Sequence, residues 1–371
     1  MMVKNFFYLI GVVLIVFGCS EKEPDIPDKT EVKEIMTLVC NYELENTHLA
    51  DNWQRFRLNS WIPSSFYPGL MAQYRVSEDE RYLKMAKLWC EANEYTLASR
   101  FRHADDHLCG STYLDIYEIE GEDFMLAPTK EQFDSILNVN TMTGREDWHW
   151  CDALFMAPPT WAKLGRITGE NKYHEFLHTQ FFDAIVPLYD SEDSLFYRDQ
   201  RYIDERSANG EKVFWSRGNG WVVGGLPRIL MNLEPNDPYR EKYEQLLQEM
   251  ASRLIQLQGD DGMWRASLLD PVEFPMKESS GTAFFCYGMA WGIINGVLEE
   301  EKFLPAVLKA WEGLCDVVNE YGRVCYVQPG GASPVVFPER YTHAYAVGGF
   351  LLAGEQMLEL IDNLNNDNSN E

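Results

Sequence analysis

CDALFMAPPTWAKL, residues 151–164, is an apolar segment with few charges, and the polar turn TGEN at 168–171 follows it. KYHEFLHTQFFDAI, at 172–185, then places its charges on one face of an amphipathic helix. A helix with so few charges is expected to be buried on all sides, whereas an amphipathic helix covers it from outside. The stretch therefore predicts a hairpin of one inner and one outer helix.

The same pattern recurs along the chain. Further inner segments are expected at 65–74, 106–118, 219–233, 281–298 and 343–358. Their outer partners are expected at 81–95, 130–137, 239–258 and 301–318, and a helix at 30–52 completes the last pair. Each of these six hairpins leaves an apolar face uncovered, so the series must close on itself or continue as a solenoid. We predict closure, which gives an all-α (α/α)6 barrel with a pocket at one end of the inner ring.

Short aromatic segments follow several of the outer helices. They lie at 195–198, 262–265 and 324–326. We expect them to form loops or small strands on one rim of the barrel.

The charge balance excludes one class of partner. The 371 residues include 32 Lys and Arg against 58 Asp and Glu, a net charge of −26. General nucleic-acid binding needs a basic surface that displaces counterions, so we expect no nucleic acid. An anionic small substrate remains possible, because a few Arg residues can create a local positive pocket within an acidic shell.

The N-terminus is typical of an exported protein. The apolar run 6–18 has 13 residues, too few for a bilayer span of about 20 residues but suited to a signal-peptide core. It ends in VFGC at 16–19, which resembles a bacterial lipobox with Cys19 as the lipidated residue; an ordinary export signal is the alternative. We expect a signal peptide at 1–19, a polar tether at 20–30, the catalytic domain at 31–362 and a disordered polar tail at 363–371. The protein would then be a lipoprotein of the bacterial envelope that contacts the membrane only through this anchor.

Two carboxylates stand at the starts of inner segments. Asp152 follows WHWC at 148–151, where burial behind two Trp rings would raise its pKa. Asp106, in DDH at 105–107, opens a second inner segment. Two carboxylates that enter one pocket from different helices suit acid–base chemistry, because their repulsion separates their pKa values. Helix N-capping is an equally good interpretation of either residue.

A third candidate site lies in FWSRGNGW, residues 214–221. Arg217, between Trp215 and Trp221, has the geometry to bind a substrate carboxylate while a Trp ring stacks on a sugar. The alternative is an Arg that bridges helix ends. The chain contains no phosphate loop, HExxH or GxSxG motif, and its His residues have no metal-ligand spacing, so we expect neither metal nor cofactor.

These residues resemble the unsaturated uronyl hydrolases of glycoside hydrolase families 88 and 105. The resemblance rests on WCDALFMAP at 150–158, DH at 106–107 and FWSRGNGW at 214–221, and SSGTA at 279–283 and AVGGFLL at 346–352 also fit. It covers roughly residues 35 to 360, and the unsaturated rhamnogalacturonyl hydrolase branch is the most similar.

The resemblance implies an enzyme with an (α/α)6 barrel and no cofactor. Such enzymes hydrate the C4=C5 bond that lyases leave in the terminal uronic acid of an acidic oligosaccharide. Asp152 would protonate C4 and then direct water onto C5, and Asp106 would help to position substrate and water. Arg217 and Trp221 match the family's substrate-contacting Arg and Trp. The partner would be an acidic unsaturated oligosaccharide, with rhamnogalacturonan or pectin fragments favoured over ulvan or glycosaminoglycan fragments.

Two departures from the family pattern concern the substrate. Relatives carry a His in a Tyr-Tyr-His loop where this chain has Arg198, and residues 121–147 look enlarged. We expect Arg198, His107 and Trp150 to contact substrate beside Arg217 and Trp221. Arg102 and Arg145 are further candidates for carboxylate or sulfate contacts.

Three alternatives use the same barrel. A conventional glycosidase would use Asp106 and Asp152 on saturated glycosides, and a sugar epimerase would need paired inner His residues. A lipid-anchored glycan-binding protein would tolerate Asp152→Asn, whereas the hydrolase would lose turnover and keep binding.

Overall fold

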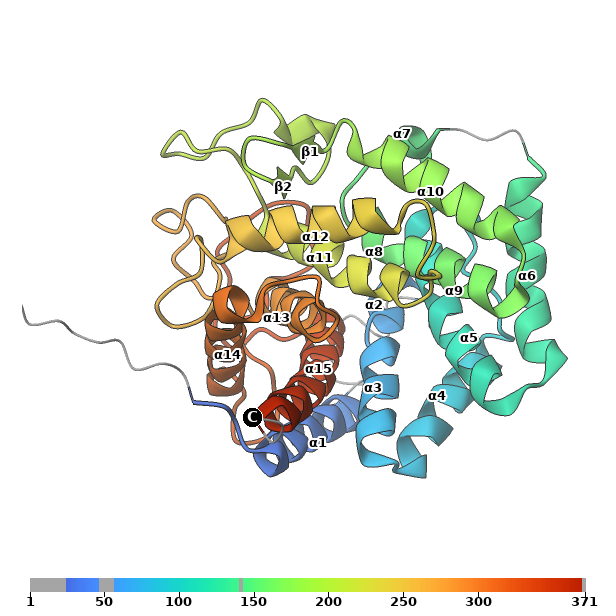
Figure 1. Cartoon of the computed structure of the whole chain (residues 1–371), viewed down its shortest axis with the longest axis horizontal. Helices are drawn as coiled ribbons and strands as arrows, with labels where there is room; N and C mark the ends of the chain where they lie inside the picture. Colours follow the sequence, from blue (N-terminus) through green and yellow to red (C-terminus); the bar gives the residue numbers. More distant parts are fainter. Residues whose placement is uncertain (1–24, 47–56, 140–142, 369–371) are drawn as a thin grey trace, which may run out of the picture.

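The computed structural model describes residues 25–46, 57–139 and 143–368 (Figure 1). The predicted signal peptide at 1–19 and its lipidated Cys19 lie outside these residues. Within the described ranges, no helix combines the length and apolar character needed to cross a membrane.

Six inner helices form a closed ring, which confirms the predicted (α/α)6 barrel. The inner helices are α3 (Tyr67–Ser77), α5 (Leu108–Glu120), α9 (Pro158–Thr168), α11 (Ser216–Leu230), α13 (Ser279–Ile294) and α15 (Ala344–Asn368). Each inner helix packs against the next, and α15 packs against α3, so the ring has no open edge. The outer helices that cover the inner ones are α1 (Lys29–Asn46), α4 (Glu80–Ala92), α6 (Asp123–Leu137), α10 (Asn171–Ile185), α12 (Arg240–Leu254) and α14 (Glu300–Asp316).

Glycines let neighbouring inner helices touch backbone to backbone. A Cβ atom on Gly69 of α3 would lie 2.6 Å from the carbonyl oxygen of Gly348 in α15. A Cβ atom on Gly220 of α11 would lie 3.0 Å from the Cα of Gly281 in α13. Close-packed interiors leave no room for such a group, so the small residues of the inner segments set the tight radius of the ring.

The predicted inner segment 151–164 is two helices. It divides into α8 (Ala153–Met156) and α9, and Pro158 and Pro159 begin the second helix. Neither proline has an N–H group to donate to the carbonyls of the preceding turn. The break therefore separates the first turn, which begins directly after Asp152, from the rest of the inner helix.

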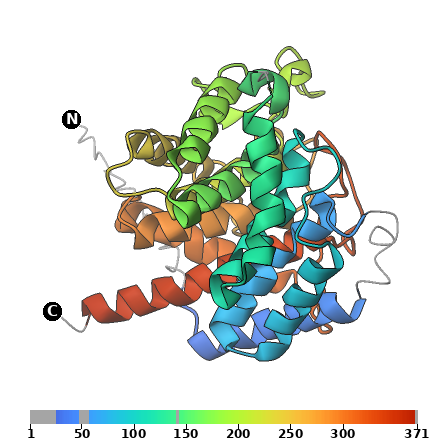
Figure 2. The same cartoon turned by 90° about the vertical axis from the view of Figure 1, so that its right-hand side faces the viewer.

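Two predicted domain boundaries shift. Helix α15 continues to Asn368, beyond the predicted start of a tail at 363, and α1 begins at Lys29 within the predicted tether. Leu364 is buried, so the apolar stripe of α15 extends past the predicted boundary. The ammonium of Lys29 lies 2.6 Å from the carboxylate of Asp362 and joins the two ends. Figure 2 shows the last turns of α15 extending beyond the neighbouring helices.

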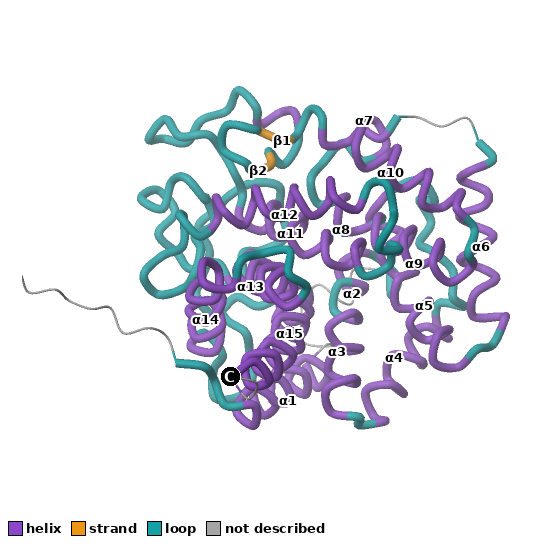
Figure 3. The backbone as a smooth tube through the Cα atoms, viewed as in Figure 1, coloured by secondary structure: helices purple, strands orange, loops and turns teal. Residues whose placement is uncertain are grey.

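The segments that join outer to inner helices gather at one end of the barrel. They include the antiparallel pair β1 (Tyr189–Asp190) and β2 (Leu195–Phe196), shown in orange in Figure 3, and the isolated bridges Arg265↔Lys277 and Val318↔Val324. The predicted small strands and loops on a rim are thus present. Each of the first five inner helices is followed by an outer helix that packs against it, and α15 follows the outer helix α14, so the inner helices all begin at this rim.

Candidate active site

Asp152 lies at the rim, directly before α8, with its side chain buried. It occupies the N-cap position, yet its carboxylate makes no capping hydrogen bond. Oδ2 instead lies 3.6 Å from Nε of Arg198 and accepts a hydrogen bond from the thiol of Cys151 at 3.5 Å. The capping interpretation of Asp152 therefore does not describe how the side chain is used.

The backbone on either side of Asp152 fixes this pairing. Trp150 forms an antiparallel bridge with Asp199, and the N–H of Cys151 donates to the carbonyl of Arg198 at 2.8 Å. Nη1 of Arg198 donates to the Asp199 carboxylate at 2.7 Å, which orients the guanidinium. The Arg198 loop and the Asp152 turn therefore run side by side, as the predicted substrate role of Arg198 requires.

Burial and charge oppose each other at Asp152. Removal from water raises the pKa of its carboxyl, and the positive charges of Arg198 and Arg217 lower it. Burial has the larger effect, so the net pKa is raised. An Asp with a raised pKa keeps its proton closer to neutral pH, which is what a general acid needs.

The second carboxyl that couples to Asp152 is Asp105. Its pKa is raised to about 7, first by burial and then by the negative charge of Asp152. Asp106, which the sequence analysis chose, is instead bound within its own loop: it accepts from the backbone N–H of Arg100 at 2.7 Å and from Nη2 of Arg100 at 2.6 Å. Asp106 thus holds the turn together, whereas Asp105 is the carboxyl whose pKa responds to the charge of Asp152.

Arg217, another predicted substrate contact, lies inside the protein in the first turn of α11. Arg217 is buried between the rings of Trp215 and Tyr345, at 4.4 and 4.5 Å from their centroids. It donates to the carbonyls of Gln328 at 2.6 Å and Pro329 at 2.9 Å. Arg217 therefore bridges the start of α11 to a distant loop, as the alternative interpretation held, while its charge still acts on Asp152.

Two predicted substrate contacts are core residues. Trp221 is fully buried and packs on Phe155 and Phe284, with centroids 4.7 and 4.6 Å apart, so it supports the floor beneath α8. Nε2 of His107 lies 2.6 Å from the carbonyl of Phe101, and its Nδ1 accepts from Trp161 at 3.3 Å. Both ring nitrogens of His107 are thus engaged inside the protein, and burial lowers its pKa to about 4. The prediction that His107 contacts substrate was wrong for this reason.

Of the remaining predicted residues, Trp150 lies next to Asp152, whereas Arg102 and Arg145 form ion pairs with other carboxylates. Trp150 lies beside Asp152 with its ring 4.7 Å from that of His103, so it stays a candidate contact. The carboxylates of Asp147 and Asp183 pair with Arg102 and Arg145, respectively. These two ion pairs tie the short helix α7 (Gly144–Asp147) to its neighbours.

Sequence reasoning missed an aromatic stack that includes Tyr345, whose ring lies 4.5 Å from the guanidinium of Arg217. Trp61 of the short helix α2 (Trp61–Ser64), Tyr345 and His343 stack with centroid separations of 5.8 and 4.3 Å. Gln328 is also fully buried, and its side chain receives the indole N–H of Trp215 at 3.2 Å. Their chain positions 61, 328 and 343–345 follow no local pattern, so only the folded ring brings them together.

The described residues hold one group of carboxylates with metal-ligand spacing, namely Asp190, Glu192 and Asp193 after β1. Asp152 and Asp105 are not in this group. The two acids share one property, because burial raises the pKa of both carboxyls.

The comparisons with known proteins agree with this fold. A family model described as Glycosyl Hydrolase Family 88 matches residues 29–361. A protein from Alteromonas sp. named unsaturated 3S-rhamnoglycuronyl hydrolase is 38% identical over 318 residues, which cover 80% of this chain and 77% of the relative. A protein of the same name from Formosa agariphila is 38% identical over 319 residues, 81% of this chain and 84% of the relative. A solved glycosyl hydrolase family 88 structure from Bacteroides vulgatus has a TM-score of 0.83 at 29% identity and covers 90% of this chain and 100% of its own.

Replacing Arg198 by Met should raise the pKa of Asp152, because the carboxylate loses the nearest positive charge that favours its ionised form. Difference infrared spectroscopy of the protonated carboxyl band across pH measures this shift, and the Asp152→Asn variant identifies the band. Arg201→Met is the matched control, since Arg201 also binds Asp199 but is largely exposed. An unchanged or lowered pKa in Arg198→Met would contradict the assigned electrostatics.

Proposed function

Because the chain belongs to glycosyl hydrolase family 88, we propose that Asp152 is the acid with which it removes a terminal 4,5-unsaturated uronic acid from oligosaccharides. The enzyme class and the removal of an unsaturated uronic acid follow from the family and from the two relatives at 38% identity. The observation that supports the role of Asp152 is its position. Its carboxyl is buried at the rim, makes no capping hydrogen bond, has a raised pKa and lies beside the guanidinium of Arg198.

The first step is protonation of C4 by Asp152. The C4=C5 electron pair takes the proton, and the ring oxygen shares the positive charge that develops at C5. Water then adds to C5 and gives a proton back to the Asp152 carboxylate, so the acid is restored. Asp105, coupled to Asp152 by charge, holds the water or the substrate near C5.

The product of water addition is a hemiketal at C5. Its ring C5–O bond breaks, C5 becomes a ketone, and the former ring oxygen remains on C1 as a hydroxyl. The resulting hemiacetal at C1 then collapses to an aldehyde and releases the neighbouring sugar. The 5-keto uronic acid leaves with no further help from the protein.

Arg198 is the residue we assign to the uronate carboxylate. That carboxylate is attached to C5, one bond from the reacting double bond, so its partner must lie next to the acid. Arg198 lies 3.6 Å from Asp152, and about a fifth of its side chain is exposed, at 21%. Its guanidinium suits a carboxylate through paired N–H donors.

The neighbouring sugar we propose is rhamnose. Both curated relatives are named for a 3S-rhamnoglycuronyl substrate. Unsaturated uronyl-rhamnose disaccharides, with and without a sulfate, are therefore favoured over glycosaminoglycan fragments.

Asp152→Asn should lower kcat about 10²- to 10⁴-fold while KM stays near the wild-type value, because the variant loses general acid catalysis. The assay follows loss of the ultraviolet absorbance of the conjugated enol acid on a panel of lyase-generated disaccharides. A saturated disaccharide is the substrate control and should not be cleaved. Turnover of the saturated sugar would favour the conventional glycosidase, and an active Asp152→Asn variant would remove Asp152 from the mechanism.

The kcat/KM of the wild type should fall as pH rises through about 7, where the coupled carboxyls lose a proton. Asp105→Asn removes a negative neighbour, so the pKa of Asp152 should fall and the basic limb should move to lower pH. Asp106→Asn is the comparison, because Asp106 binds Arg100 instead. A larger shift in Asp106→Asn than in Asp105→Asn would restore Asp106 as the second carboxyl.

We also propose export and lipidation at Cys19, supported by the signal-like residues 1–19. Cys19→Ala should prevent incorporation of labelled palmitate in a bacterial host and release the protein from the membrane fraction. Equal labelling of wild type and variant would refute the lipobox and leave an ordinary export signal.

A further inference from the structure

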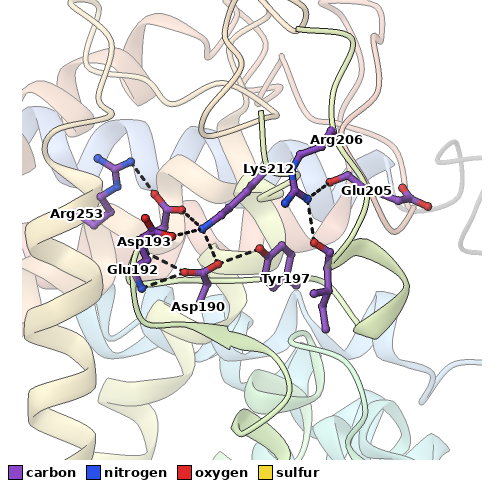
Figure 4. Close-up of polar contacts among 9 residues, drawn as sticks. Asp190, Glu192, Asp193, Tyr197, Glu205, Arg206, Lys212 and Arg253 are labelled. Carbon is purple, nitrogen blue, oxygen red and sulfur yellow. Dashed lines mark hydrogen bonds and ion pairs between the residues drawn. The ribbon is translucent and has the colours of Figure 1, made fainter. Parts of the chain in front are cut away.

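The turn that joins β1 to β2 brings three carboxylates together. Ligand oxygens of Asp190, Glu192 and Asp193 lie within 4.8 Å of one another, a spacing that could hold a metal ion. The ammonium of Lys212 occupies the middle of this group, as Figure 4 shows, at 2.8 Å from Asp190, 3.0 Å from Glu192 and 2.8 Å from Asp193. A side-chain cation thus lies among three carboxylates whose oxygens have metal-ligand spacing.

Two of the three ion pairs are shielded from water. The side chains of Asp190 and Asp193 are 13% and 15% exposed, and that of Lys212 is 22% exposed, whereas Glu192 is 85% exposed. Exposed pairs contribute little, so Asp190 and Asp193 carry the interaction. Their hydrogen bonds raise the pKa of Lys212, which therefore stays charged. Arg253, from α12, adds a contact of 3.1 Å to Asp193.

The cluster continues toward the active site through Tyr197. The hydroxyl of Tyr197 donates to Asp190 at 2.9 Å, beside the Lys212 contact (Figure 4). Tyr197 immediately precedes Arg198, whose carbonyl accepts from Cys151 and whose Nε lies 3.6 Å from Asp152. Lys212, Asp190, Tyr197 and Arg198 therefore form a short chain of contacts that ends at the acid.

The hairpin depends on this support because its own pairing is small. β1 and β2 have two residues each, and a two-stranded pair of this size is not stable alone. Asn219 at the start of α11 holds the β2 end through hydrogen bonds of 2.8 and 3.0 Å to Phe196. The opposite end, the turn at 190–193, is held by Lys212 and Arg253.

We propose that Lys212 is a positioning residue for Asp152: its ammonium gathers the 190–193 turn as a bound divalent cation would, and so fixes Arg198 beside the acid. The inference rests on the proposed role of Asp152. The charged and titratable groups that face Asp152 are Cys151, Arg198, Arg217 and, from the 3₁₀ turn before α5, Asp105. Among them Arg198 is the one joined to Lys212, through Tyr197 and Asp190, in addition to its own contacts with Cys151 and Asp199.

The test compares Lys212→Ser with Lys212→Arg. Serine removes the cation and leaves the three carboxylates, so Arg198 should drift and the basic limb of kcat/KM should move to higher pH. A shift of one pH unit corresponds to a tenfold change in the protonated fraction of Asp152. Lys212→Arg should keep the wild-type profile. Lys87→Ser is the matched control, since Lys87 pairs with Glu120 at 2.7 Å between α4 and α5, outside this chain of contacts.

Whether Lys212 takes the place of a bound cation can be measured separately, by metal binding to the Lys212→Ser variant. Tb³⁺ should bind Lys212→Ser with luminescence sensitised by the nearby Tyr rings, and should not bind this turn in the wild type. CaCl₂ should then return the pH profile of Lys212→Ser to that of the wild type. No Tb³⁺ signal in the variant, or bound ion without recovery, would overturn the proposal, as would an unshifted profile in folded Lys212→Ser.

Tyr197→Phe is the second variant, in case Lys212→Ser does not fold. It removes only the hydroxyl link to Asp190, so the same upward shift is expected with the Lys212 cluster intact, and an unshifted profile would overturn the proposal. If the proposed function is wrong, the results differ from those expected if only the role of Lys212 is wrong. The wild type would then be inactive on every unsaturated disaccharide, while Tb³⁺ binding to Lys212→Ser would be unaffected.

Discussion

The carboxylate of Asp152 is buried where the inner helices meet the rim, and the pairing of residues 150–152 with 198–199 decides its surroundings. A buried carboxyl with no cation nearby would hold its proton too tightly to act as a base in the second half of the reaction. One in a short bidentate ion pair would hold no proton at neutral pH. The Arg198 contact of 3.6 Å lies between these extremes, so the same group can donate the proton and take it back.

The closed ring makes this environment possible. The inner helices begin at one rim, so the positive ends of their dipoles converge on the site. Backbone contacts such as Gly69 with Gly348 keep the ring narrow, and packed aromatic side chains form the floor beneath α8. Trp221 and Phe284 fill that floor. The fold thus supplies burial, which raises the pKa of Asp152, while Arg198 on a rim loop and Arg217 in the first turn of α11 supply the positive charges that limit the rise.

The helix pairs could be predicted because the distribution of apolar and charged residues within each segment indicates whether that helix is buried on all sides or on one face. The contrast between an uncharged and an amphipathic segment is local, so the ring and its six hairpins followed from the pattern. Asp152 could be singled out for the same reason. The partner of each polar group could not be predicted: whether Asp105 or Asp106 faces Asp152 depends on how Arg100 folds back. Arg217 likewise meets Gln328, 111 residues away.

The net charge of −26 does not prevent the site from binding an acid sugar, because the charges act at different depths. Surface carboxylates are screened over about 8 to 10 Å at physiological salt, whereas buried charges are screened much less. Arg198 and Arg217 are partly or fully buried, so their field dominates inside the pocket. In the 190–193 turn the signs of the charges are exchanged, because the cation Lys212 lies between the carboxylates of Asp190 and Asp193. A cation carried by the chain itself holds that turn with no dependence on the ions in the surroundings.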